Sequence, residues 1–317
     1  MPTARFPIHE IFGGVSRQVM GVIGLNLRVL EYFVEVARDE NISRAAQRLY
    51  VSQPAISKQI QMLEEELKHK LFRRLNGRLE LTDEGRLFLR RAEDILELVH
   101  KTKVEFETLD SSTVGEVHIG AAESHAMKHV ARVMRSMQKK FPRIRYHLYS
   151  GNGEDLYYRL DGGLIDFLIT LQSVDILKYE SIELPTPDVW GVIMRRDDPL
   201  SVKQSITVDD LRDVPLICSR EAMNDECLQW FGREFKQFRV SITYNLLYNA
   251  SIMVREGLGY AISLDRLADT RDGSELCFRP LEPKMISTLR IVWRKDALLS
   301  TAASIFLREL QSSLQEE

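Results

Sequence analysis

The feature that most constrains the fold is the segment 43–67, where two helical patterns are separated by only a few residues. Ser43 is a predicted cap for the first pattern, in which Ala45 and Ala46 are small enough for another helix to approach closely. The break falls at Tyr50-Val51, and helical spacing then resumes. An amphipathic helix beginning after Asn26 precedes both patterns. Two helices joined by so tight a turn are typical of a helix-turn-helix.

The second helix of the pair has one apolar side and one polar side. Ser52 is its predicted cap, and Pro54 lies in the first turn, where a missing N–H costs nothing. The apolar side consists of Ile56, Ile60, Leu63 and Leu67. The polar side consists of Ser52, Gln53, Ser57, Lys58 and Gln61. A helix with such a polar face is suited to the DNA major groove.

The polar face has the chemistry of base recognition. The amides of Gln53 and Gln61 can pair bidentately with adenine edges, and Lys58 can reach guanine or phosphate. The alternative is an ordinary helical hairpin whose polar face contacts only water. The spacing alone does not separate these two interpretations.

The residues that follow favour DNA binding. Asn76-Gly77 stands between two short alternating runs, which predicts a β-hairpin directly after the recognition helix, in the position of a wing. The predicted DNA-binding head comprises residues 25–81. Over residues 25–85 the acidic and basic residues balance, but the basic side chains are clustered. We expect these clusters to contact phosphates on either side of the groove. The residues assigned to phosphates are Arg44, Arg73, Arg74 and Arg78.

A long helix is predicted over residues 82–110, with Thr82 as its cap. Its apolar residues recur at alternating spacings of four and three residues, as in a coiled-coil seam. The assigned seam residues are Phe88, Ala92, Ile95, Val99 and Phe106. We expect this helix to pair with the same helix of a second copy. Packing against the chain's own carboxy-terminal domain is the alternative.

These segments together resemble the DNA-binding head and linker helix of LysR-type transcriptional regulators. The resemblance rests on "LEYFVEVARDENISRAAQRLYVSQPAISKQIQMLEEELKHKLFRR" and "LTDEGRLFLRRA". It implies a sequence-specific regulator that binds double-stranded DNA, responds to a small organic effector and forms homodimers that extend to homotetramers. It implies no enzymatic activity and no cofactor.

The carboxy-terminal half, 114–317, alternates strands and helices, which predicts an α/β domain with open parallel sheets. Two prolines near Pro185 indicate a crossover into a second lobe, and the chain returns near Ile286. The predicted lobes are about 114–186 with 286–317, and about 187–285. This arrangement resembles the family's effector domain, which is similar to a periplasmic binding protein.

Ligands of such sheets bind beyond the carboxyl ends of strands, where helix amino termini present free N–H groups. The candidate effector residues lie at such positions and are Glu123, Ser124, Ser150, Ser219, Arg220, Asn249 and Ser263. Glu123 departs from the small hydroxyl residues that many family members have in this loop. A carboxylate there argues against a simple anionic effector unless Arg220 offsets its charge. The alternative is that Glu123 and Ser124 only cap a helix.

Other functional classes have less support. No phosphate-binding loop, dinucleotide fingerprint or nucleophile elbow occurs in the sequence, which disfavours an enzyme. A metal site at Glu123, His125 and His129 and a redox pair of Cys218 and Cys227 are weaker possibilities, and no metal site is assigned. A solute receptor is disfavoured by the basic winged head.

The expected cellular location of the protein rests on two further observations. The three cysteines form no disulfide framework, which is typical of a reducing cytoplasm. The sequence has no run of about 18 apolar residues, and residues 1–24 are predicted to be a flexible extension without a secretion signal. We therefore expect a cytoplasmic protein that does not contact a membrane.

Overall fold

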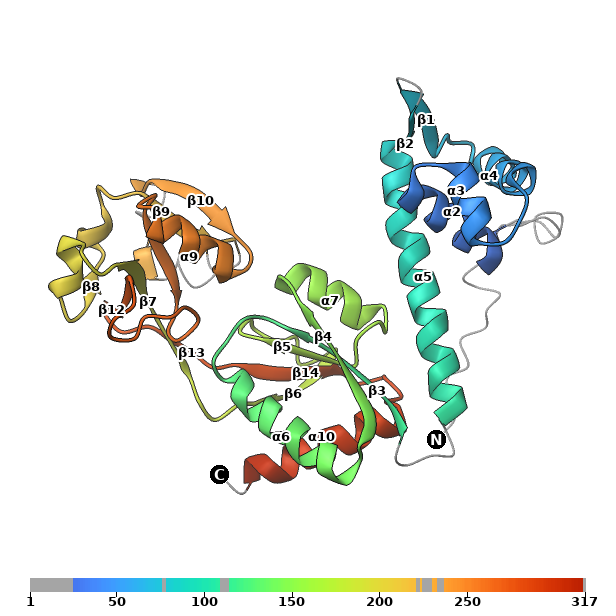
Figure 1. The fold of residues 1–317 in the computed structure, drawn as a ribbon. Helices are drawn as coiled ribbons and strands as arrows, with labels where there is room; N and C mark the ends of the chain where they lie inside the picture. Colours follow the sequence, from blue (N-terminus) through green and yellow to red (C-terminus); the bar gives the residue numbers. More distant parts are fainter. Residues whose placement is uncertain are drawn as a thin grey trace. The chain divides into compact units, whose positions relative to one another are not determined.

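The computed structural model describes residues 25–75, 78–108, 114–220, 223, 230–232 and 237–315. The chain divides into two compact units, Met1–Thr102 and Lys103–Glu317, and each is described by itself (Figure 1). The predicted extension 1–24 lies outside the described residues. Within the described residues, no helix is both long and apolar enough to cross a membrane.

The first unit begins with three helices, α2 (Leu27–Asp39), α3 (Ile42–Arg48) and α4 (Gln53–Leu67). The side chain of Asn26 caps α2, as predicted. The prediction that Ser43 caps α3 is wrong. Asn41 is the cap, because its extended backbone lets its Oδ1 accept from the N–H groups of Ser43 and Arg44 at 2.9 and 3.1 Å.

The turn between α3 and α4 is as tight as the sequence predicted. Tyr50 has a φ of 54° and Val51 N donates to Ala46 O, which reverses the chain within a few residues. Ser52 occupies the N-cap position of α4 but makes no side-chain capping bond. Its hydroxyl is therefore exposed at the start of the helix.

The wing consists of β1 (Phe72–Leu75) and β2 (Arg78–Leu81), which pair antiparallel with Leu75 opposite Arg78. The predicted turn residues Asn76-Gly77 lie outside the described residues. Glu64 of α4 anchors the wing: its Oε1 accepts from Leu71 N and Phe72 N at 2.9 and 3.1 Å. The wing is thus held to the end of α4 by a buried carboxylate.

Helix α5 (Asp83–Thr108) follows the wing, and Thr82 caps it by accepting from Gly85 N at 2.9 Å. The amino-terminal half of α5 belongs to the core of the head. Ala92 is fully buried there, and the ring of Phe88 meets Phe33 edge to face with centroids 4.8 Å apart. Ala92 is therefore not exposed to a partner helix, whereas Phe88 is only partly buried and its place in a dimer seam stays a prediction.

The second unit contains a five-stranded sheet in the order β4-β3-β5-β14-β6 (Figure 1). Its strands are β3 (Val114–Ala121), β4 (Arg143–Ser150), β5 (Phe167–Thr170), β6 (Tyr179–Glu183) and β14 (Arg290–Arg294). Helices α6 (Met127–Lys140) and α10 (Thr301–Gln315) pack on one face, and α7 (Gly153–Asp161) covers the other. Val117 and Ile119 face the first layer.

The other lobe contains a second sheet, with a main path in the order β10-β9-β11-β7-β12-β8 and with β13 paired to β7. Its strands are β7 (Asp188–Arg195), β8 (Ile206–Thr207), β9 (Leu216–Ser219), β10 (Val240–Tyr244), β11 (Tyr260–Leu264), β12 (Leu276–Glu282) and β13 (Ile286–Ser287). Its helices are α9 (Leu247–Arg255) and the 3-10 turns η1 (Pro199–Val202) and η2 (Asp209–Leu211). The predicted helix 226–235 lies largely outside the described residues.

The expectation of open parallel sheets is wrong in part. In the first lobe β3 pairs parallel with β4 and β5, whereas β14 runs antiparallel to its neighbours. In the second lobe β7 is antiparallel to β11 and β12. β7 and β14 are the first strands after the two segments in which the chain crosses between the lobes.

Candidate DNA-binding face and effector pocket

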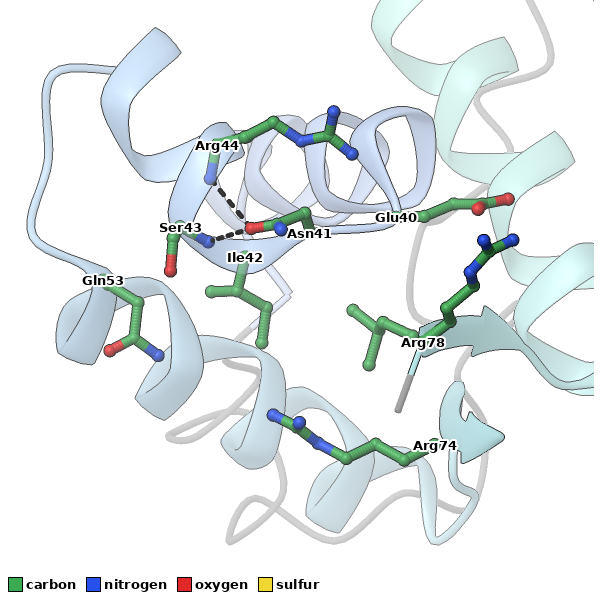
Figure 2. Close-up of a pocket in the computed structure, with 9 residues that line it drawn as sticks. Glu40, Asn41, Ile42, Ser43, Arg44, Gln53, Arg74 and Arg78 are labelled. Atoms are coloured by element: carbon green, nitrogen blue, oxygen red, sulfur yellow. Dashed lines mark hydrogen bonds between the residues drawn. The ribbon is translucent and has the colours of Figure 1, made fainter. Parts of the chain in front are cut away.

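An open cavity of about 540 Å³ lies between α3, the start of α4 and the wing (Figure 2). Its lining combines one base-reading amide with three cations: Gln53, Arg44, Arg74 and Arg78. Figure 2 shows Arg74 reaching from the wing toward the cavity and Gln53 facing it from α4. Four of the predicted DNA-binding residues, taken from three separate segments, therefore surround one cavity.

The remaining predicted contacts on α4 are exposed or half-buried along one face of the helix. Gln53 Nε2 donates to Ser57 Oγ at 2.8 Å, and Gln61 Nε2 donates to Glu65 Oε1 at 2.9 Å. These bonds between residues four apart hold both amides in defined orientations on the helix surface. Lys58 is exposed beside them.

Acids from elsewhere in the head neutralise part of the basic cluster. Arg48 pairs with Glu35 and Asp39 of α2, and Arg73 lies 3.6 Å from Glu80 across the wing. Arg74 and Arg78 make no ion pair within the described part of the chain. The positive charge available to a polyanion is therefore concentrated at the cavity, and Arg73 contributes less than its position in the sequence suggests.

Sequence reasoning missed Glu40 and Asn41, which also line the cavity. Asn41 could have been found, because an asparagine before a helical pattern is a strong capping signal. Glu40 has a left-handed backbone, with φ at 48°, and lines the same cavity as Arg78. It is an acid that a phosphate would have to approach.

A second, much smaller pocket of about 60 Å³ lies between the two lobes of the second unit. Three of the predicted effector residues line it: Glu123, Ser219 and Ser263. The other lining residues are Ala122, Gly151, Leu171, Gln172, Trp190, Tyr244, Asn245, Leu247, Leu264 and Leu267. Gln172 follows the predicted strand 167–170, so the rule used for the other strand ends could have found it.

Four predicted effector residues do not line this pocket: Ser124, described below, and three others. Ser150, Arg220 and Asn249 are exposed elsewhere, although the neighbouring Gly151 does line it. Helix α9 begins at Leu247, two residues earlier than predicted, so Asn249 lies within its first turn. Among the described residues that line the pocket there is no lysine, arginine or histidine, and Arg220 does not offset the charge of Glu123 there.

Ser124 is buried and bonded to the crossover strand. Its hydroxyl donates to Asp188 Oδ2 and accepts from Ala126 N at 2.9 Å. Asp188 is fully buried. Burial raises the pKa of its carboxyl above the ordinary value, and the Ser124 hydrogen bond acts in the opposite direction. Ser124 therefore serves the internal hydrogen bonding of the crossover.

Glu123 connects the two lobes. Its Oε2 accepts from Leu247 N, the first residue of α9, at 2.6 Å. A carboxylate at a helix amino terminus is stabilised by the free N–H groups and the helix dipole. Glu123 thus caps a helix of the other lobe, 124 residues away.

The other possibilities raised by the sequence find little support. His129 Nε2 is within 2.8 Å of Thr186 Oγ1, so this ring is already engaged. Cys218 is buried, and burial raises the pKa of its thiol to about 12, which suppresses the reactive thiolate. Cys227 lies outside the described residues.

Comparisons with known proteins agree with both halves of the chain. Residues 27–86 match the family model described as bacterial regulatory helix-turn-helix protein, lysR family, and residues 110–315 match the LysR substrate binding domain. The uncharacterized transcriptional regulator YvbU of Bacillus subtilis is 27% identical over 288 residues, covering 89% of this chain and 97% of that protein.

Two further similarities concern a named regulator and a solved fold. The hydrogen peroxide-inducible genes activator of Pectobacterium carotovorum is 27% identical over 287 residues, covering 87% of this chain and 92% of that protein. The crystal structure of CbnR, a LysR family transcriptional regulator, has a TM-score of 0.70 at 22% identity, covering 92% of this chain and 99% of that one. The chain belongs to the LysR family of DNA-binding transcriptional regulators, with a helix-turn-helix domain and an effector-binding domain.

Proposed function

We propose that this regulator reads its operator with the exposed face of α4 and grips the backbone with the arginines around the adjoining cavity. The observation that carries the proposal is the cavity itself, in which Gln53 lies with Arg44, Arg74 and Arg78. Direct base contacts are assigned to Gln53, Ser57, Lys58 and Gln61. Phosphate contacts are assigned to Arg44, Ser52, Arg73, Arg74 and Arg78, while Pro54 starts the helix.

We further propose that the inter-lobe pocket receives a small organic effector that is uncharged or cationic. Among the described residues that line the pocket, Glu123 is the only carboxylate and none carries a basic side chain. Trp190 and Tyr244 provide aromatic surface, and Gln172, Asn245 and Ser219 provide neutral hydrogen-bonding groups. An anionic effector would meet an uncompensated negative charge.

The pocket must enlarge to admit such a ligand. Its volume of about 60 Å³ is far below the roughly 300–1,000 Å³ of ordinary ligand sites. Binding therefore requires the lobes to move relative to each other, and the bond between Glu123 and Leu247 is one contact that would have to change. Differential affinity for the two arrangements is what would couple effector to DNA.

We also propose that the chain acts as a homodimer or homotetramer in the cytoplasm and catalyses no reaction. Leu87, Ile95 and Leu98 are exposed on α5, at 59%, 40% and 41%, and fall within about 80° on a helix of 3.6 residues per turn. Such an apolar stripe is typical of a pairing surface. The two relatives described above are named as a transcriptional regulator and a genes activator, which supports the absence of an enzymatic role.

The proposal is tested with the full chain on genomic DNA fragments. Captured fragments are footprinted with and without a panel of amines, neutral metabolites and carboxylates. We expect Ser219→Val, in the pocket, to lose the effector-dependent change in footprint, and Ser150→Val, outside it, to retain the change. An effector response that survives Ser219→Val, or that is elicited only by carboxylates, contradicts the assigned pocket. Absence of any selective fragment contradicts DNA recognition itself.

A further inference from the structure

A cluster of one carboxylate and two imidazoles lies on the first lobe's sheet, outside both cavities. Glu116 and His118 belong to β3, and His147 lies directly opposite His118 on β4 in the parallel ladder. Residues two apart on a strand point to the same face, so all three side chains lie on one side of the sheet. Their potential ligand atoms lie within 4.8 Å of one another.

The carboxylate is oriented toward both rings. Glu116 Oε1 accepts from Arg145 Nη2 at 2.6 Å, which fixes the group and directs the second oxygen inward. Glu116 Oε2 then lies 3.6 Å from His118 Nε2 and 3.6 Å from His147 Nε2. In a tetrahedral site with metal–ligand bonds of about 2.0–2.1 Å, neighbouring ligand atoms are roughly 3.3–3.5 Å apart. The observed separations are close to that range.

The surroundings combine rigidity with access. The side chains of Glu116 and His118 are each 7% exposed, whereas that of His147 is 41% exposed at the edge strand of the sheet. Asp166 Oδ2 accepts from the backbone N–H of His118 at 2.8 Å and pins that strand residue. His147 Nε2 is buried and makes no hydrogen bond within the described residues. An ion could therefore enter past His147 and meet a fixed carboxylate.

We propose that Glu116, His118 and His147 form a binding site for a divalent transition-metal ion such as Zn²⁺. Imidazole and carboxylate are ligands that suit zinc, and three protein ligands leave one position for water. The two rings are stacked, with centroids 4.5 Å apart and planes 11° from parallel, so they must tilt to direct both lone pairs at one ion. The exposed His147 ring has room to do so.

This site is separate from the effector pocket, since none of its three residues lines that pocket. It also differs from the trio Glu123, His125 and His129 suggested by the sequence. The inference does not depend on the proposed effector or operator.

The test uses the metal-free full chain and titrates it with Zn²⁺ in a calorimeter and with Co²⁺ by visible absorption. We expect one ion per chain and the intense ligand-field bands of a four-coordinate cobalt site. His147→Gln and Glu116→Gln should weaken binding at least 10-fold. His125→Gln, a histidine outside the cluster, should leave binding unchanged.

Three results would overturn the proposal. One is the absence of saturable binding by wild type. Another is weak six-coordinate cobalt absorption only. The third is equal binding by wild type and His147→Gln, provided that circular dichroism shows both to be folded. Failure here would leave DNA binding untouched, because no DNA measurement enters the test.

Discussion

The two cavities differ in size, charge and internal bonding. The head cavity has a volume of about 540 Å³ and includes three arginines, whereas the inter-lobe pocket measures about 60 Å³ and includes none. Around the head cavity Arg74 and Arg78 lack acidic partners within the described residues. At the inter-lobe pocket the carboxylate of Glu123 already accepts a hydrogen bond from α9. The head presents an open site for a polyanion, whereas the effector site proposed between the lobes is small and closed.

The largest expected effect concerns how the heads are brought together. The double variant Ile95→Asp, Val99→Asp places two carboxylates on α5. If two α5 helices pair there, both carboxylates would have to be desolvated, at a cost of several kcal/mol. We expect the dimer dissociation constant to rise by more than about 1,000-fold, as measured by sedimentation. Glu93→Lys, at an exposed position on the side of the helix away from this surface, is the matched control and should remain dimeric. If the double variant stays fully dimeric, association depends on the effector domain, and the comparison must be redrawn.

The second-largest expected effect is the loss of DNA affinity when positive charge is removed from the head cavity. Removing two phosphate contacts by Arg74→Ala and Arg78→Ala should lower affinity by about 50- to 100-fold at 0.1 M salt, for every sequence alike. The slope of log affinity against log salt should fall by about 1.8. Arg73→Ala should lose less, because Arg73 is partly neutralised by Glu80. An equal loss for Arg73→Ala would show that the wing, rather than the cavity, sets the charge contact.

A smaller effect is expected when the contact between the lobes is removed. Glu123→Ala deletes the cap of α9 and should lower the free energy of unfolding of the effector domain by about 1–2 kcal/mol. Tryptophan fluorescence reports this domain, since Trp190, Trp230 and Trp293 all lie in it. Glu154→Ala, in the first turn of α7, is a matched exposed glutamate and should change stability by less than about 0.5 kcal/mol. Equal stability of Glu123→Ala and wild type would mean that the bond contributes nothing.

The smallest effect is a pH dependence from Asp188. Because burial raises its folded-state pKa, the group stabilises the fold most at pH below 3.8, and this contribution is lost as pH rises through the folded-state pKa. Relative to Asp188→Asn, wild type should therefore lose stability as the pH rises above 3.8, by about 1.4 kcal/mol for each unit by which the pKa is raised. Denaturant unfolding of both proteins across this range measures the difference. Parallel curves would contradict a raised pKa.

The sequence predicted the head better than the effector pocket, for a physical reason. The face of α4 depends on helical spacing within one segment, so Gln53, Ser57 and Gln61 could be assigned without knowing the tertiary fold. The predicted seam on α5 included Ala92, which is buried in the head, because a heptad pattern does not distinguish a partner helix from the chain's own core. Local periodicity identifies an apolar side and leaves its partner open.

In the effector domain the decisive contacts join distant segments. Glu123 meets Leu247, and Ser124 meets Asp188. No local pattern reports such pairs, so the strand-end rule placed Glu123, Ser219 and Ser263 at the pocket but also included Arg220 and Asn249, which do not line it. Asn245, directly after the strand that ends at Tyr244, lines the pocket instead of Asn249.

The central claim is that α4 reads bases while the cavity arginines read only the backbone. The most direct test compares the affinity of the full chain for a captured operator and for a scrambled duplex, using wild type, Gln53→Ala and the matched surface variant Gln138→Ala. We expect Gln53→Ala to reduce the difference between the two binding free energies by about 1–3 kcal/mol, with the salt slope unchanged. Gln138→Ala should behave as wild type. An unchanged ratio for a folded Gln53→Ala protein would contradict the assignment of base recognition to this face.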